Sequence, residues 1–277
     1  NVQGAADMGC QPQQGNGYFP VADKEIQDFY TAKSGVGHPT KAGLKIPEIF
    51  DAAINKELKA VWIIGEDVVQ TDPNSAHVVK AMNSLDLLVV QEIFLSETAK
   101  HADVVLPGTT FLEKDGTFTN TERRVQRVNK AAEPLPGTKP DGVIVTDMMQ
   151  KLGYDQPTYD ADQVLAEIAD IVPFFKGITR ERLGKLGLQW PVKEDGTDTK
   201  ILHDKEFKLG KGRFKYFDFK ESAEIENNQK NYPLILTTSR VLQHYNAATM
   251  TRRTNNIDIV DEDILLLNPK DAEYRDL

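Results

Sequence analysis

The sequence has 277 residues, with 33 basic and 42 acidic side chains, a net charge of −9 and one cysteine. A disulfide framework needs a second cysteine, and zinc fingers and iron–sulfur clusters commonly use about four, so Cys10 alone cannot build any of these sites. A nucleic-acid-binding protein is expected to carry an excess of basic residues, and this sequence carries an excess of acidic ones. The negative net charge also argues against binding to anionic membranes. We therefore expect no nucleic-acid partner.

The apolar segments are short. The longest run lies within residues 59–64, far below the about 20 residues of a transmembrane helix, and no signal segment opens the chain. We expect a cytoplasmic protein without a transmembrane segment, with one large or two ordinary domains. Because the chain starts at Asn1 without an initiator Met and stops at Leu277 within an expected helix, we also expect a fragment of a longer protein.

The first half of the chain alternates between helical and strand patterns. The first forty residues are rich in Gly, Gln, Pro and Asn, which predicts loops around one helix over residues 23–32. A helical pattern begins at Ile46, and residues 60–64 form an apolar run that ends at Gly65. Such a run, bounded by a turn residue, is typical of a strand buried in a parallel sheet.

The same unit recurs twice. Residues 74–84 have helical spacing and precede an apolar strand at 87–90, and residues 96–101 precede another at 103–106. Alternating helices and buried strands predict an α/β fold with a doubly wound, mainly parallel sheet and right-handed crossovers.

The second half is less regular. A polar stretch containing Gly116 precedes an amphipathic helix over residues 141–152, and residues 157–187 have a helical pattern. Residues 213–219 alternate polar and aromatic side chains, as an edge strand does. We place a domain boundary near Asn231, giving an α/β domain over residues 1–230. Further strands expected at 232–238 and 263–267 would begin a β-dominated domain over residues 231–277.

Small, acidic and hydroxyl residues follow the three expected strands. They are Gly65, Glu66, Asp67 and Thr71 after the first, Gln91 and Glu92 after the second, and Gly108 and Thr109 after the third. Ligands of parallel sheets bind beyond the carboxyl ends of the strands. Glycine lets a diphosphate approach the backbone, Thr hydroxyls bond its oxygens, and carboxylates accept hydrogen bonds from ribose or a guanine edge, so this set indicates a nucleotide-bearing ligand. From these residues alone, helix capping by Asp67 and Asp72 and a solvated Glu92 fit as well.

Other patterns are less specific. The G-x-G-x-x-G fingerprint is absent, which does not support an ordinary NAD site, and the five histidines have no zinc-ligand spacing. The arginines at 123, 124 and 127 fit a surface ion-pair network as well as a phosphate clamp. Arg240 and His244 follow an expected strand, and they would share a site if the chain is helical there; a structural role fits equally.

Several motifs together resemble the catalytic subunit of molybdenum- or tungsten-dependent formate dehydrogenases, within the molybdopterin oxidoreductase superfamily. They occur in the family's order along nearly the whole chain. The matching stretches are residues 1–9 (NVQGAADMG), 65–67, 70–72, 90–94 (VQEIF), 102–107 (ADVVLP), 113–124 (EKDGTFTNTERR), 139–141 (KPD), 238–240, 244–245 and 249–253.

The resemblance implies that the α/β region holds part of a pair of molybdopterin guanine dinucleotides carrying molybdenum or tungsten, and that a C-terminal β-barrel starts near Tyr232. The positions that it implies for the dinucleotide are Gly65, Glu66, Asp67, Thr71, Gln91, Glu92, Gly108, Thr109 and Asp141, with Asp141 facing the guanine. It places Ser239, Arg240 and His244 near the pterin end.

The family's metal-ligating Cys or selenocysteine, the adjacent His, the active-site Arg and the cysteines of a [4Fe-4S] cluster have no counterpart here. We expect these catalytic and cluster residues upstream of Asn1, so that the fragment alone is inactive. The resemblance implies formate and CO2 as substrate and product, with iron–sulfur or flavin subunits as electron-transfer partners. Two alternatives remain open: another molybdopterin oxidoreductase of the nitrate reductase type, and a pterin-free scaffold subunit of an NADH dehydrogenase complex.

Overall fold

The computed structural model describes residues 2–207 and 209–277, so Asn1 of the opening motif lies outside the described residues. The chain divides into two compact units, Asn1–Lys208 and Leu209–Leu277, and each is described by itself. This division comes before the domain boundary expected near Asn231, which stays a prediction.

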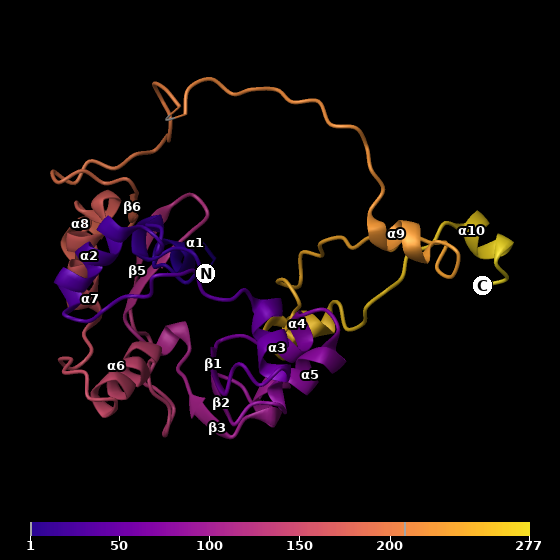
Figure 1. Ribbon diagram of the computed structural model, residues 1–277, viewed down its shortest axis with the longest axis horizontal. Helices are drawn as coiled ribbons and strands as arrows, with labels where there is room; N and C mark the ends of the chain where they lie inside the picture. Colours follow the sequence, from indigo (N-terminus) through magenta and orange to yellow (C-terminus); the bar gives the residue numbers. More distant parts are fainter. Residues whose placement is uncertain (1, 208) are drawn as a thin grey trace. The chain divides into compact units, whose positions relative to one another are not determined.

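A parallel sheet of three strands forms one part of the first unit (Figure 1). The strands lie in sequential order and are β1 (Ala60–Ile64), β2 (Leu87–Glu92) and β3 (Val104–Pro107). The helical segments around them are α3 (Ile46–Ile54), α4 (Val68–Thr71), α5 (Ser75–Met82) and the 3-10 helix η2 (Thr98–His101). The predicted alternation of helices and parallel strands is therefore confirmed. The doubly wound arrangement stays a prediction.

The helices start where local hydrogen bonds fix their first turn. In α3, the Glu48 side chain accepts a hydrogen bond from the backbone N–H of Lys45 at 2.8 Å, which closes the first turn. In α5, Asn74 adopts left-handed backbone angles, and its side chain accepts from the backbone N–H of His77 at 3.4 Å. Asn tolerates this conformation better than most residues, so both the turn and the cap suit position 74.

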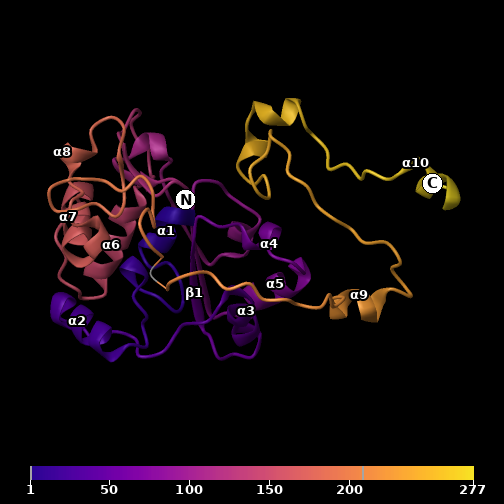
Figure 2. The same ribbon diagram turned by 90° about the horizontal axis from the view of Figure 1, so that it is seen from above.

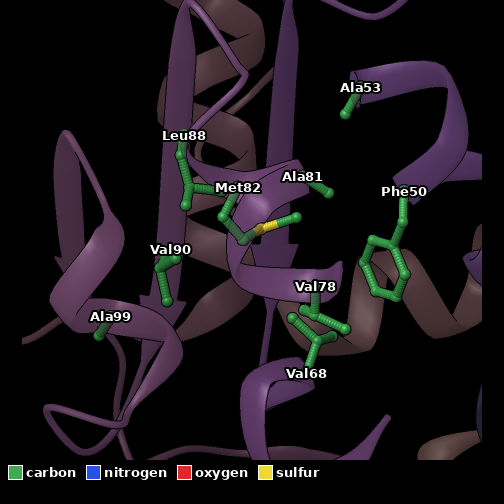
Figure 3. Close-up of a cluster of buried hydrophobic side chains, with 9 residues drawn as sticks. All are labelled: Phe50, Ala53, Val68, Val78, Ala81, Met82, Leu88, Val90 and Ala99. Carbon is green, nitrogen blue, oxygen red and sulfur yellow. The ribbon is translucent and has the colours of Figure 1, made fainter. Parts of the chain in front are cut away.

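One face of the parallel sheet carries a hydrophobic core (Figure 3). Leu88 and Val90 stand two residues apart on β2, so both side chains point to the same face. The core comprises Phe50, Ala53, Val68, Val78, Ala81, Met82, Leu88, Val90 and Ala99. Burial of a side chain such as Leu88 contributes about 1.5–3 kcal/mol, so this packing holds α3, α4 and α5 against the sheet.

A second sheet, antiparallel, follows the parallel one in the chain, and the sequence analysis did not predict it. Its strands are β4 (Gly116–Thr119), β5 (Arg124–Val128) and β6 (Leu188–Gln189). Between β4 and β5, the Asn120 side chain accepts from the backbone N–H groups of Glu122 at 2.9 Å and Arg124 at 3.0 Å. The turn signal was the Asn-Thr-Glu-Arg stretch itself, because an Asn that bonds its own backbone is typical of turns.

Helices cover this second sheet. They are α7 (Ala161–Ile171) and α8 (Arg180–Leu183), which are neighbours in both views (Figures 1 and 2), and α6 (Asp141–Lys151) precedes them in the chain. The second core comprises Val125, Leu165, Val172, Phe175, Ile178, Leu183 and Val192. The helical content expected over residues 141–152 and 157–187 is confirmed, because apolar spacing alone identifies amphipathic helices of this length.

The N-terminal segment contains a buried carboxylate that bonds to the rest of the first unit. It contains α1 (Val2–Asp7), η1 (Asn16–Tyr18) and α2 (Lys24–Ser34), of which α2 confirms the helix expected near residues 23–32. Asp7, at the end of α1, is completely buried. It accepts hydrogen bonds from Gln3 Nε2 at 2.9 Å, Tyr18 Oη at 2.8 Å and Trp190 Nε1 at 2.8 Å.

The second unit holds short helices joined by extended chain. They are α9 (Ala223–Asn228), η5 (Thr251–Arg253), η6 (Asn255–Asp258) and α10 (Pro269–Tyr274). The strands expected at 213–219, 232–238 and 263–267 are not formed, so those strand predictions are wrong for this structure. A strand needs a neighbour for its backbone hydrogen bonds, and none is paired with these segments in the described residues.

Across the described ranges, the structure contains no helix that is both long enough and apolar enough to span a bilayer.

Candidate functional site

The residues that follow the parallel strands lie at one edge of the sheet, as the strand directions require. The backbone N–H of Gly65, directly after β1, donates to the carbonyl of Gln91 at 2.9 Å. The N–H of Gly108, directly after β3, donates to the carbonyl of Glu92 at 3.0 Å. Gln91 and Glu92 are the last two residues of β2 itself. The sequence predicts that the strand ends at residue 90 and that these two residues follow it.

Asp141 joins this edge through the backbone. Gly108 forms a parallel bridge with Lys139, whose N–H donates to the carbonyl of Pro107 at 3.1 Å, so α6 starts beside the end of β3. The amide nitrogen of Gln91 then donates to Oδ1 of Asp141 at 2.7 Å. A carboxylate at the first residue of an α-helix is also stabilised by the helix dipole. Gln91, Gly108 and Asp141 therefore form one cluster.

The glycine at position 108 lies close to the Asp141 carboxylate. A Cβ atom there would lie 3.1 Å from Oδ1 of Asp141, which is tighter than ordinary carbon–oxygen contact. The bare Gly108 backbone thus leaves room for the carboxylate.

Lys114 is the cation of the cluster, and the sequence analysis did not select it. Its ammonium group forms an ion pair with Oδ2 of Asp141 and lies 3.5 Å from the carbonyl oxygen of Thr109. Both partners are partly accessible, with 25% of the Lys114 side chain and 40% of the Asp141 side chain exposed. Lys114 lies within the EKDGTFTNTERR motif, which contributes to the family resemblance. The resemblance assigned no role to this lysine.

Two buried polar atoms of the cluster lack partners among the described residues. Oε1 of Gln91 and Oγ1 of Thr109 have no hydrogen bond, although the two residues are only 1% and 2% exposed. A buried polar group left unpaired costs about 1–3 kcal/mol, and native proteins contain few of them. Such atoms beside an accessible carboxylate and a lysine fit a polar ligand that supplies the missing partners.

Asp67 has a different environment. It is buried, and its Oδ1 accepts hydrogen bonds from the backbone N–H of Thr98 at 2.9 Å and the Thr98 hydroxyl at 2.6 Å. Its Oδ2 accepts from the N–H of Glu97 at 3.4 Å. These bonds tie the start of α4 to η2, so the Asp67 carboxylate is already occupied within the protein.

The other acidic residues of the edge are Glu66, Asp72 and Glu92, and nearby groups affect each of them. The Thr71 hydroxyl donates to Oε1 of Glu66 at 2.8 Å. Burial raises the pKa of the Glu92 carboxyl; the backbone N–H of Ile93 opposes this effect, while the charge of Asp67 adds to it. Burial also raises the pKa of Asp72, with a further contribution from Glu66. This part of the edge therefore disfavours additional negative charge.

Ser239, Arg240 and His244 belong to the second unit, away in sequence from the cluster. His244 contacts the hydroxyl of Thr251 at 3.1 Å and the carbonyl of Val260 at 2.7 Å, and Arg240 donates to the side chain of Asn246 at 3.1 Å. Residues 240–244 are not helical, so the condition under which Arg240 and His244 would share a site is not met.

Comparison with known proteins identifies the family. The family model described as "Molybdopterin oxidoreductase" matches residues 5–151, which include the parallel sheet and the whole of α6. The chain belongs to the molybdopterin oxidoreductase family.

Curated relatives match almost the whole chain. The F420-dependent formate dehydrogenase subunit alpha of Methanocaldococcus jannaschii is 43% identical over 99% of this chain and 41% of its own length. The F420-dependent formate dehydrogenase 2 subunit alpha of Methanococcus maripaludis is 42% identical over the same shares. A putative formate dehydrogenase of Staphylococcus haemolyticus is 38% identical over the full chain and 28% of its own length. The chain thus spans less than half the length of these relatives.

A solved structure supports the fold. Acetylene hydratase from Pelobacter acetylenicus superposes with a TM-score of 0.56 and 21% sequence identity, over 86% of this chain and 35% of that one. At this identity the likeness concerns the mixed α/β fold alone.

Family membership indicates a molybdopterin cofactor with molybdenum or tungsten, and the cluster fits the polar part of such a group. The cluster offers an unpaired amide oxygen on Gln91, a hydroxyl on Thr109, a cation on Lys114 and a carboxylate on Asp141. In the part of the chain that the structure describes, no group of three or more His, Cys, Asp or Glu side chains is arranged to hold a metal ion directly. Hydrogen-bonding groups of this kind suit the organic part of the cofactor.

Proposed function

We propose that this chain is the cofactor-binding portion of a formate dehydrogenase catalytic subunit, and that the cofactor is a pair of molybdopterin guanine dinucleotides with molybdenum or tungsten. The complete enzyme would convert formate to CO2, one proton and two electrons, or run the reverse reaction. The unpaired, buried Oε1 of Gln91 beside Asp141 is the observation that supports the proposal, because a polar ligand would supply its missing partner. The names of the relatives support formate as the substrate.

The Asp141 carboxylate accepts hydrogen bonds from the N–H groups of the guanine edge. Each carboxylate oxygen has two lone pairs, so the bonds from Gln91 and Lys114 leave one acceptor position on each oxygen. Gln91 fixes the orientation of the carboxylate, and Lys114 balances its charge. A hydrogen bond in which one partner is charged is stronger than a hydrogen bond between two neutral groups. A carboxylate therefore suits a residue that anchors the base.

The acidic residues of the edge suit the sugar rather than the diphosphate. Glu66 and Glu92 would repel an anion, whereas their oxygens accept hydrogen bonds from ribose hydroxyls. The Thr109 hydroxyl, which has no partner among the described residues, is a donor of the kind that a diphosphate needs. Gly65 and Thr71 border this region, and Asp67 supports it through η2.

The bound metal centre supplies the redox chemistry of formate oxidation, and this chain's residues hold the cofactor. The proposal also includes a doubly wound sheet, a C-terminal barrel that forms only in the complete protein and to which residues 231–277 would contribute, and Ser239, Arg240 and His244 near the pterin. It further includes a [4Fe-4S] cluster elsewhere in the complete protein, iron–sulfur or flavin partner subunits, and a cytoplasmic location.

The decisive experiment compares the full-length enzyme with its Asp141→Ala variant. We expect the wild type to contain molybdenum or tungsten and to reduce a dye with formate. We expect the variant to retain less guanine nucleotide per protein, because it loses hydrogen bonds to a charged group worth about 1.5–3 kcal/mol each. Asp147→Ala, on the same helix but in a surface ion pair with Lys139, is the matched control.

Wild-type enzyme without either metal would favour the pterin-free scaffold and overturn the proposal. Normal guanine content in Asp141→Ala would remove Asp141 from the site.

A further inference from the structure

A cavity of about 200 Å³ lies beside the Asp141 carboxylate. Lys114, Asp141 and Tyr159 contribute polar groups to its lining, and Phe118, Val164 and Leu165 contribute apolar ones. For comparison, a cavity of about 150 Å³ in a protein core accommodates benzene. The cavity is therefore large enough for a flat heterocycle, and its polar groups can bond the edge of such a ring.

Tyr159 forms one wall of this cavity by packing directly on Gly142, the residue after Asp141. A Cβ atom at position 142 would lie 2.2 Å from Cε2 and 2.3 Å from Cζ of the tyrosine ring. Only glycine allows this approach without displacing the ring. The contact sets the position of the ring relative to the first turn of α6, and hence relative to Asp141.

The Tyr159 hydroxyl is available as a donor. Among the described residues it has no hydrogen-bond partner, although the charges of Asp141 and Asp160 act on it. Burial raises the pKa of the hydroxyl, and the charges of Asp141 and Asp160 raise it further. The phenol therefore keeps its proton at neutral pH and can donate it to a ligand acceptor.

We propose that Tyr159 is a base-specificity residue, whose ring closes the cavity beside Asp141 and whose hydroxyl donates a hydrogen bond to an acceptor on the guanine ring. This inference rests on the proposed function. Guanine presents two neighbouring N–H donors and, on the adjoining edges, oxygen and nitrogen acceptors. Asp141 matches the donors, while Tyr159 and Lys114 match the acceptors. Cytosine and adenine each present only an amine beside a ring acceptor, so they satisfy the carboxylate less well.

The test uses full-length apoenzyme, produced in cells that cannot make molybdopterin, and GDP, CDP and ADP as probes in titration calorimetry. We expect wild type to bind GDP more tightly than CDP or ADP. Tyr159→Phe keeps the ring and removes one donor, so GDP affinity should fall about threefold to tenfold. Tyr159→Ala should lose more, because it also opens the cavity.

Tyr154→Phe is the matched control. It removes a hydroxyl that donates to the carbonyl of Ser34 outside the cavity, so GDP affinity should not change. If wild type prefers GDP and Asp141→Ala loses this preference, while both Tyr159 variants bind GDP like wild type, the role of Tyr159 is overturned and the proposed function stands. If wild type does not distinguish GDP from CDP and ADP, both fall.

Discussion

The amide nitrogen of Gln91 lies 2.7 Å from Oδ1 of Asp141, and the two residues are fifty positions apart in the chain. We predict that Gln91→Met separates stability from ligand binding. The loss of the amide removes a donor from Asp141, but 40% of that side chain is exposed and water can replace the bond. The variant also removes the unpaired Oε1, so the free energy of unfolding should stay within about 1 kcal/mol of wild type.

Guanine nucleotide retention by the full-length Gln91→Met enzyme should nevertheless fall, because Asp141 loses its fixed orientation. Urea unfolding and nucleotide analysis measure the two quantities separately. A large loss of stability with unchanged nucleotide content would contradict this view of the Gln91 amide.

For Asp67 we predict an effect on stability, because its carboxylate is bonded within the protein. In Asp67→Ala, the backbone N–H and the hydroxyl of Thr98 lose their acceptor inside the protein, since Thr98 is completely buried. We expect the free energy of unfolding to fall by about 2–4 kcal/mol, as for buried donors left unpaired. The control Glu66→Ala, at the exposed neighbouring position, should change it by less than about 0.5 kcal/mol. Equal effects in urea unfolding would show that the Thr98 bonds contribute little.

The contrast between these residues shows what the sequence could predict. The position of Gln91 and Gly108 at one sheet edge followed from the strand pattern, because parallel strands end on the same side. The bond from Gln91 to Asp141 could not be derived from spacing, since it depends on how the chain returns to Gly108 after a second sheet. The family resemblance, rather than any local pattern, selected Asp141.

Asp67 and Lys114 mark the limits of motif reasoning. Asp67 lies inside a matching motif, yet its carboxylate is occupied by Thr98 and Glu97, which only a three-dimensional structure reveals. Lys114 also lies in a motif, but charged residues are usually solvated, and its partner is 27 positions away. The prediction of strands after Asn231 was wrong for another reason. A sequence with strand propensity forms a strand only where another strand pairs with it.

The core of the parallel sheet gives a prediction about stability. Leu88 is almost completely buried between β2 and the covering helices. Leu88→Ala should lower the free energy of unfolding by about 2–5 kcal/mol, which combines lost burial and the remaining cavity. Leu152→Ala, at an exposed position just after α6, should change it by less than about 0.5 kcal/mol. Urea denaturation of the two variants checks the difference; similar midpoints would contradict the core assignment.

Glu92 gives a prediction about pH. Its carboxyl has a pKa above the ordinary value of 4.5, so burial favours the protonated form in the folded protein. The resulting stabilisation is fully present below pH 4.5 and is lost as the pH rises through the raised pKa. Glu92→Gln keeps an oxygen for the N–H of Ile93 and removes the charge, so it should be more stable than wild type at pH 7.

The difference between Glu92→Gln and wild type should disappear on acidification to about pH 4, where an unfolded Glu is half protonated. Glu57→Gln, at an exposed position, is the control and should leave the profile of stability against pH unchanged. A Glu92→Gln variant that is less stable than wild type at pH 7 would show that the charged form is the favoured one.

Asp7 connects the N-terminal segment to Trp190. Its carboxylate is completely buried and accepts three hydrogen bonds, from Gln3, Tyr18 and Trp190, which lie on separate segments. Asp7→Ala leaves the Tyr18 hydroxyl and the Trp190 indole N–H without their acceptor, while Gln3 keeps its bond to Tyr18, so the free energy of unfolding should fall by about 2–4 kcal/mol.

The exposed ion pair of Asp28 with Lys24 supplies the matched comparison for Asp7. Asp28→Ala removes the same functional group from the surface and should cost less than about 0.5 kcal/mol. Trp190 fluorescence during urea unfolding reports on the segment directly, because the indole N–H is one of the three donors. If Asp7→Ala unfolds at the same urea concentration as Asp28→Ala, the buried carboxylate does not tether α1, and the packing of Tyr18 against Trp190 must hold the segment instead.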